Sequence, residues 1–269
     1  MSNFNITAEH FESKLVNNMV LVRLKCGALD IVTNPSMNED FYDLRQSVNR
    51  SPEIRGYVEI SDSELNLRDE TKALVQFISQ DDEEYRKNGR SYGYLHDIIV
   101  ARFRNSIGRL LLTLVDYEKP SVAGLQGTIT GEYLGLALAF DARFATAETV
   151  IDFNNVRVGL PGSPGLTHLM PRYIGISRAQ SLIYRSETID VHEAHAIGLI
   201  SEIVDTHQEL VDRCKKEILD ISDTHQHLVK YHRQQILPST KEISNALEQY
   251  YDCMAMSVPK IRESVKHIG

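Results

Sequence analysis

Cysteine is scarce in this chain of 269 residues, and its spacing argues against a disulfide framework. The three cysteines, Cys26, Cys214 and Cys253, are odd in number, far apart and without CxxC spacing, which indicates free thiols in a reducing compartment. No window approaches the roughly 18 apolar residues of a membrane span, and the N-terminal residues lack the basic and apolar regions of a signal peptide. We therefore expect a cytoplasmic protein that is neither exported nor membrane-spanning.

The chain also lacks an excess of basic residues. Lysine and arginine total 29 against 37 aspartates and glutamates, a formal charge of -8, so we expect neither nucleic acid nor an anionic membrane as a partner. No phosphate-binding or dinucleotide-binding loop is present, and the histidine groups HEAH (192–195) and HQH (225–227) lack the HExxH spacing of a zinc helix. Asp190 and Glu193 instead form a capping box, and we expect no metal and no tightly bound cofactor.

Apolar patterning predicts an alternation of strands and helices, and hence the α/β class. Residues 11–16 and 19–24 form a predicted hairpin around Asn17-Asn18, and a helix is predicted from Asn34-Pro35 to residue 51. Further predicted strands cover residues 57–60, 121–125, 142–145 and 150–153, a helix covers 95–114, and residues 127–140 are predicted as a loop followed by a helix. The polar residues 62–91 are expected to be mobile.

After residue 204 the pattern is almost entirely helical. Helices are predicted over residues 208–219 and 224–236, another after the capping box Ser239-x-x-Glu242, and a last one from Val258. We therefore divide the chain into an α/β core, residues 1–204, and a helical C-terminal segment, residues 205–269.

Several motifs between residues 119 and 204 occur in the order and spacing of one known family. They are KP (119–120), GLQG (124–127), LAFDARFA (138–145), GLPGSPGLT (159–167), PRYIG (171–175) and AHAIGLI (194–200). This series resembles the signature of the enoyl-CoA hydratase/isomerase, or crotonase, superfamily. The resemblance implies a spiral of ββα turns followed by a helical segment that packs between subunits, usually in trimers or pairs of trimers.

The resemblance also implies a site in which two backbone amides hold the carbonyl of an acyl-CoA thioester. One amide lies at the start of a helix beginning near Gly131, where the unpaired amides and the helix dipole favour a developing oxyanion. The register assigns this amide to Glu132, with the side chain directed away, or to Gly131 if the register shifts by one residue. The second amide is assigned to Leu67. Gly135, Gly162 and Asp152 are expected to shape the substrate pocket.

The main departure from the family concerns the two glutamates with which its hydratases add water. Their positions are occupied here by Gly135 and Asn155, neither of which transfers protons at neutral pH. We therefore expect a lyase or isomerase reaction other than standard hydration, such as isomerisation, decarboxylation or C–C cleavage of an acyl-CoA or carrier-protein thioester. A β-diketone hydrolase and a catalytically inactive binding or scaffold protein are the alternatives on the same fold.

The candidate catalytic residues are Glu132, Ser163, Asn155 and His168, and each has a structural alternative. Glu132 could simply interact favourably with the helix dipole, and Ser163 could cap the following helix. Asn155 could belong to a turn, and His168 could lie on a helix face. Asp152 could be an ordinary solvated residue at a strand end.

Overall fold

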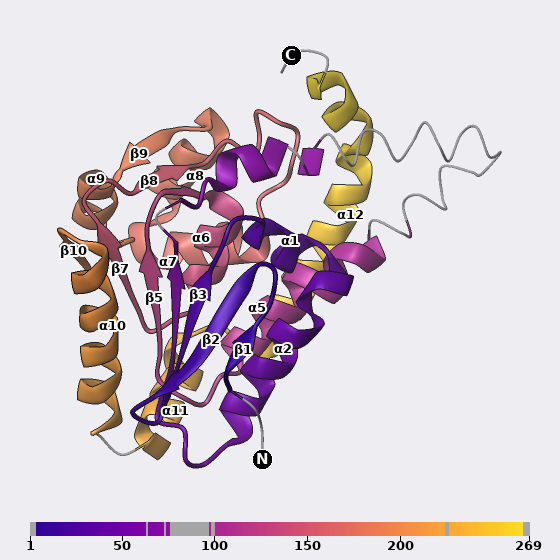
Figure 1. The fold of residues 1–269 in the computed structure, drawn as a ribbon. Helices are drawn as coiled ribbons and strands as arrows, with labels where there is room; N and C mark the ends of the chain where they lie inside the picture. Colours follow the sequence, from indigo (N-terminus) through magenta and orange to yellow (C-terminus); the bar gives the residue numbers. More distant parts are fainter. Residues whose placement is uncertain are drawn as a thin grey trace.

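The computed structural model describes residues 4–62, 64–72, 74–75, 97, 100–223 and 226–265. Most of the polar segment that we predicted to be mobile, residues 76–91, lies outside the described residues. The rest alternates strands and helices, which confirms the α/β prediction (Figure 1).

A seven-stranded sheet forms the centre of the fold. Its strands are, in spatial order, β1 (Ile6–Thr7), β2 (Phe11–Val16), β3 (Met19–Leu24), β4 (Gly56–Ser61), β5 (Ser121–Leu125), β7 (Ala142–Thr146) and β10 (Glu202–Val204). The first three are antiparallel neighbours, and β3 to β10 are parallel. The predicted hairpin is confirmed, because Asn17 and Asn18 both adopt the positive φ angles, 50° and 60°, that this turn requires.

A smaller sheet consists of β6 (Thr128–Thr130), β8 (Val150–Asp152) and β9 (Thr188–Asp190). The prediction of a loop after Gly127 was wrong, because Thr128 to Thr130 pair in parallel with β8. Three residues were too few to show a strand periodicity. This pairing places Thr130 opposite Asp152, which brings two distant candidate segments together.

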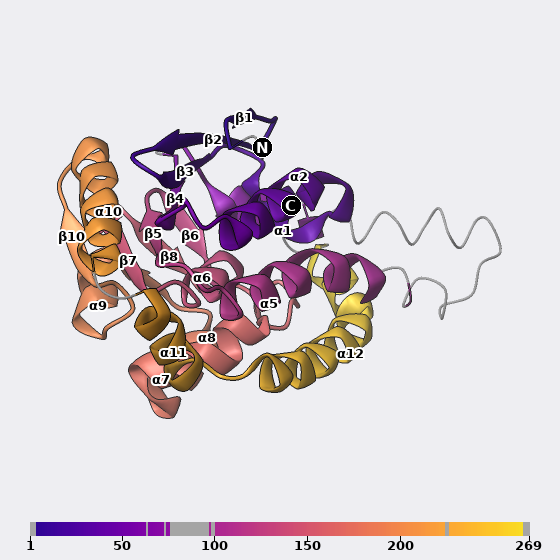
Figure 2. The same ribbon diagram turned by 90° about the horizontal axis from the view of Figure 1, so that it is seen from below.

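Helices cover both faces of the large sheet (Figures 1 and 2). They are α1 (Ala28–Thr33), α2 (Pro35–Arg50), the π-helical turn η1 (Arg104–Gly108), α5 (Arg109–Val115), α6 (Gly131–Ala137), the π-helical turn η2 (Gly165–Leu169), α7 (Met170–Ile174), α8 (Ile176–Arg185), α9 (Val191–Ala196), α10 (His207–Ser222), α11 (Gln226–Ile236) and α12 (Thr240–Val265). α10 packs on β4, β5 and β7, while α2, α5 and α6 contribute to the main core on the other side. The short α1 was not predicted.

The C-terminal segment departs from the sequence prediction at its end. We predicted a new helix from Val258, but α12 is one continuous helix that passes through Pro259. Tyr250, Met254, Val258 and Ile261 recur at helical spacing and are all buried. The apolar stripe across the proline therefore keeps the helix in one piece, although proline removes one backbone donor.

α11 is anchored to the core by one buried arginine. The Arg233 guanidinium donates to the carbonyls of Tyr117 (3.0 Å), Leu114 (2.8 Å) and Ala139 (3.2 Å), and forms an ion pair with Asp141. Its side chain is only 4% exposed. Because burial of an unpaired charge is costly, this full set of acceptors is what makes the buried position tolerable.

A second buried ion pair joins α2, β4 and α6. Arg45 on α2 donates through Nη2 to Oε2 of Glu59 on β4 (2.5 Å), and both side chains are 1% exposed. Tyr57 donates to the same oxygen (2.8 Å), and Tyr133, in the first turn of α6, donates to Oε1 (2.9 Å). Both carboxylate oxygens of Glu59 are therefore satisfied.

Candidate active site

The first turn of α6 leaves its amides without a side-chain cap. Thr130 occupies the N-cap position with an extended backbone, but its hydroxyl makes no capping hydrogen bond. Gly131 begins the helix beneath Asn155, where an added Cβ would lie only 2.7 Å from Oδ1 of Asn155. A glycine at this position therefore lets Asn155 approach the helix start closely.

The Glu132 carboxyl group is buried against two of the other candidates. Glu132 as a whole is 5% exposed. Asn155 donates through Nδ2 to Oε1 (2.5 Å), and the backbone amide of Ser163 donates to the same oxygen (3.3 Å). The structure thus brings Glu132, Asn155 and Ser163 together from α6, the loop after β8 and the loop before η2. We call these three residues the Glu132 cluster.

The surroundings of Glu132 shift its protonation equilibrium. Burial is the main cause, and it raises the pKa of the carboxyl group to about 7 because the charged form loses its hydration. The donor groups of Ser163 and Asn155 act in the opposite direction without cancelling this effect. A carboxyl group with this pKa can accept and return protons near neutral pH, which suits general acid–base catalysis.

Several buried polar atoms in the cluster and at the neighbouring Thr130 have no hydrogen-bond partner among the described residues. They include Oε2 of Glu132, Oγ of Ser163 and Oγ1 of Thr130. Unpartnered buried polar atoms are uncommon and costly, so several of them in one place indicate a site prepared for a ligand. The interpretation of Ser163 as a side-chain cap was wrong, because its hydroxyl makes no such bond.

Gly135 and Gly162 both lie close to Leu166 of η2. A Cβ at Gly135 would lie 2.6 Å from the Leu166 amide nitrogen and 2.9 Å from Oγ of Ser163. At Gly162 a Cβ would lie 3.0 Å from a methyl carbon of Thr167. The position at which a family hydratase carries its first glutamate is therefore too crowded here for any side chain.

Asp152 is not the solvated residue that we considered. It is 3% exposed and accepts a hydrogen bond from Nε of Arg68 (2.6 Å) and another from the Thr188 hydroxyl (3.1 Å). Both partners of this ion pair line a narrow pocket together with Thr130 and Asn155, with room for about one water molecule, ≈ 10 Å³. In this structure the space beside the α6 start is therefore nearly closed.

Leu67 lies in a segment that runs beside the strand leading into α6. Asn66 pairs with Thr128 of β6, and the Thr128 amide donates to the Leu65 carbonyl (3.2 Å). Leu67 itself is fully buried and begins a helical stretch in which the Thr71 hydroxyl donates to its carbonyl (2.8 Å). Its role as the second amide donor stays a prediction.

His168 is outside the Glu132 cluster. It lies in η2, its Nε2 atom is buried without a partner, and burial together with the nearby Arg172 lowers its pKa. No motif pointed to Tyr250 of α12, yet this buried phenol is close enough to Glu132 for the carboxylate to add to the effect of burial in raising its pKa. No short motif could connect residues so far apart in the chain.

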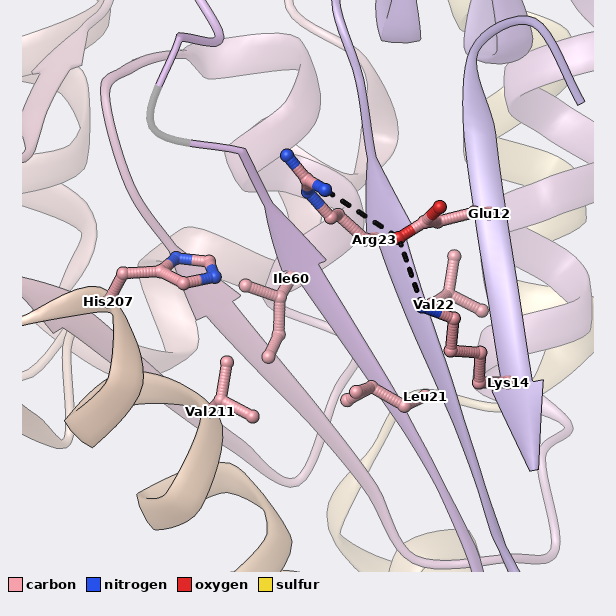
Figure 3. A pocket seen from close by; sticks show the side chains of 8 residues that line it. All are labelled: Glu12, Lys14, Leu21, Val22, Arg23, Ile60, His207 and Val211. Carbon is pink, nitrogen blue, oxygen red and sulfur yellow. Dashed lines mark ion pairs between the residues drawn. The ribbon is translucent and has the colours of Figure 1, made fainter. Parts of the chain in front are cut away.

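Another hollow lies on the opposite side of the sheet, between α10 and strands β2 to β4 (Figure 3). Glu12 forms ion pairs there with Lys14 (3.7 Å) and Arg23 (3.6 Å). His207 is hydrogen-bonded through Nδ1 to Oε1 of Gln126 (2.8 Å). Because these polar groups already have partners, this hollow shows less sign of a prepared site than the Glu132 cluster does.

Two further features of the described residues bear on other classes of protein. Within the part of the chain that the structure describes, no three His, Cys, Asp or Glu side chains are grouped so that they could hold a metal ion. His195 instead contacts the Ile200 carbonyl through Nδ1 (3.0 Å), and Asp190 caps α9 by accepting from the Glu193 amide. None of the described helices combines the length and the apolar character needed to cross a bilayer.

The chain belongs to the enoyl-CoA hydratase/isomerase family, whose sequence profile matches residues 94–266. It is 30% identical over 128 residues to the mouse protein methylglutaconyl-CoA hydratase, mitochondrial, covering 48% of this chain and 40% of that protein. It is 27% identical over 164 residues to crotonyl-CoA hydratase of Syntrophomonas wolfei, covering 59% of this chain and 62% of that protein. These matches therefore span less than two thirds of either relative.

The fold extends over nearly the whole chain. An enoyl-CoA hydratase from Bacillus halodurans superposes with a TM-score of 0.77 at 18% identity, covering 96% of this chain and all of that one. The structure named Pseudomonas aeruginosa OdaA gives a TM-score of 0.74 at 15% identity. The crotonase-like fold predicted from the sequence is thereby confirmed, including the N-terminal half, where the motifs were absent.

Proposed function

We propose that this protein binds an acyl thioester of coenzyme A, or of a carrier protein with the same pantetheine arm, and forms an enolate at the start of α6. The amide of Glu132 or Gly131, together with that of Leu67, would hold the carbonyl oxygen. The Glu132 carboxyl group would move the proton. The substrate class rests on family membership, because the relatives are named as hydratases of acyl-CoA esters.

One observation carries the assignment of Glu132. Its carboxyl group is buried beside the uncapped first turn of α6, has a pKa raised to about 7, and keeps one oxygen free of hydrogen bonds. A single group of this kind can remove a proton from the α-carbon and return it to another carbon. This favours isomerisation over hydration, which in this family uses glutamates where Gly135 and Asn155 stand.

The test is deuterium exchange at the α-carbon. Butyryl-CoA, glutaryl-CoA and acetyl-CoA are incubated with the protein in D₂O, and loss of the α-proton signal is followed by NMR. We expect Glu132→Gln to slow exchange by roughly 100- to 10,000-fold, the usual range for loss of a general base. Exchange by the wild-type protein should rise with pH through about 7, because the carboxylate is the base.

A matched control is Glu193→Gln, which alters a half-buried glutamate of α9 that pairs with Arg178 and is far from the cluster in sequence. It should leave exchange unchanged. If Glu132→Gln exchanges as fast as the wild-type protein, Glu132 is not the base. Binding of the three thioesters without any exchange would favour the scaffold alternative, and turnover of a free β-diketone alone would favour the hydrolase.

The assembly and location expected from the sequence remain part of this proposal. A homotrimer or a pair of trimers should appear in analytical ultracentrifugation, and a cytoplasmic location in cell fractionation. A monomer that exchanges protons at full rate would remove the trimer from the proposal and leave the chemistry in place.

A further inference from the structure

The buried ion pair beneath α6 has a feature that a stabilising contact does not need. Its acceptor, Glu59, receives hydrogen bonds from three elements: Arg45 on α2, Tyr57 on β4 and Tyr133 on α6. Tyr133 directly follows Glu132 and lies in the same helical turn. The hydrogen bonds around Glu59 therefore reach the helical turn whose amides and carboxyl group form the candidate site.

The geometry of a helix links the two side chains. Consecutive residues point about 100° apart around the axis, so fixing the direction of Tyr133 fixes that of Glu132. Glu59 holds the Tyr133 side chain against the sheet. The side chain of the preceding residue, Glu132, therefore points to another side of the helix, where its carboxyl group contacts Asn155 and Ser163. Because the first turn has no side-chain cap, its rotation depends on packing and on the bond from Tyr133 to Glu59.

We propose that Arg45, Glu59 and Tyr133 are positioning residues that set the rotation of the first turn of α6, and thereby aim the Glu132 carboxyl group into its buried pocket. Arg45 holds the Glu59 carboxyl group in place, since its guanidinium bonds to Oε2 and lies over the rings of Phe41 (4.4 Å) and Tyr57 (5.7 Å). Glu59 then presents Oε1 to Tyr133. The catalytic consequence, though not the aiming itself, rests on the function proposed above.

The same aromatic cluster offers a matched control. Tyr117 lies 5.8 Å from Tyr57, is equally buried, and its hydroxyl has no hydrogen-bond partner. Tyr133→Phe and Tyr117→Phe therefore remove the same atom from the same core, but only the first removes a bond to Glu59. Any difference between the two variants reports on that bond.

The first measurement does not depend on activity. The protein is labelled with ¹³C in the glutamate carboxyl groups, and the Glu132 signal, assigned by its loss in Glu132→Gln, is titrated by NMR. In Tyr133→Phe the midpoint should fall by roughly half a pH unit or more, because a loosened turn lets water reach a carboxyl group whose raised pKa comes mainly from burial. In Tyr117→Phe it should not move. An unchanged midpoint in Tyr133→Phe would overturn the proposal, whatever happens to stability.

The second measurement separates aiming from catalysis. In the exchange assay Tyr133→Phe should lower the rate roughly 10- to 100-fold with little change in thioester affinity, as expected for a misplaced reacting group. In the Glu132→Gln background the same substitution should have no further effect on the rate. An equal effect in both backgrounds would overturn the proposal. If the wild-type protein shows no exchange but the midpoint moves as expected, the proposed function fails and the aiming role stands.

Discussion

Glu59 and Glu132 are both buried glutamates, yet the protein treats their carboxylates in opposite ways. Glu59 has an arginine partner and hydrogen bonds on both oxygens. Among the described residues, Glu132 forms no ion pair and receives hydrogen bonds on one oxygen only, and burial raises its pKa to about 7. A buried carboxylate with every bond satisfied holds structure together, whereas one left partly unsatisfied is available for chemistry. The same substitution at the two positions should therefore have opposite effects on stability.

The largest change in stability is expected for Glu59→Gln. The substitution keeps the shape but removes the charge that compensates Arg45, so a buried guanidinium is left unpaired. We expect a loss of about 3 to 5 kcal/mol in the free energy of unfolding. Urea denaturation at pH 7 measures it. A loss below about 1 kcal/mol would mean that Arg45 finds other compensation and that the comparison with Glu132 does not hold.

Glu132→Gln should stabilise the protein at pH 8. Because burial raises the pKa of Glu132 to about 7, the folded state binds its proton more tightly than the unfolded state does. Stability therefore falls as pH rises from the ordinary carboxyl pKa to about 7, and removing the titration restores on the order of 2 to 3 kcal/mol above pH 7. Urea denaturation of both proteins at pH 5 and pH 8 checks this. Curves that differ equally at the two pH values would contradict it.

Gly135→Ala tests how tightly the pocket around Glu132 is closed. In an exposed helix this change would stabilise by roughly 1 kcal/mol. Here the added methyl group would meet the Leu166 amide and the Ser163 hydroxyl, so we expect a loss of about 1 to 3 kcal/mol. A thermal melt with a higher midpoint than the wild-type protein would show that the loop moves aside easily.

The smallest effect is expected for Tyr117→Phe. The hydroxyl that it removes is buried without a partner, so its loss should change stability by no more than about 0.5 kcal/mol or increase it slightly. The same denaturation experiment gives the value. A large loss of stability would mean that the Tyr117 hydroxyl has a hydrogen-bond partner within the Glu59 network.

The fold was readable from the sequence where one residue type decides the local structure. Asn17-Asn18 determined the hairpin, and Asn34 accepts a hydrogen bond from the Ser36 amide at the start of α2 as its cap position predicted. β6 escaped because three residues carry no periodicity, and the unbroken α12 escaped because the packing of its apolar stripe outweighs one proline. In both cases the secondary structure depends on packing between residues far apart in the chain. A short stretch of sequence does not contain that information.

The site was predictable in its residues but not in its arrangement. Motif spacing placed Glu132, Ser163 and Asn155 in one region, and the structure brings these three together. It could not reveal that the Glu132 carboxyl group turns towards Asn155, because that direction depends on Tyr133 and a glutamate 74 residues away. Asp152 was misjudged for the same reason, since its partner Arg68 lies 84 residues earlier.

The Arg233 anchor has a consequence for the integrity of the chain. A polypeptide ending at residue 204 would lose the only guanidinium that the described residues direct to the carbonyls of Leu114 and Tyr117 and to Asp141. These acceptors lie where α5 ends and β5 and β7 begin. Without Arg233 they would be left unpaired, and the truncated chain would lose contacts at this end of the sheet. The helical segment after residue 204 is thus needed for the core to fold stably, and a protein truncated at residue 204 should be insoluble when expressed.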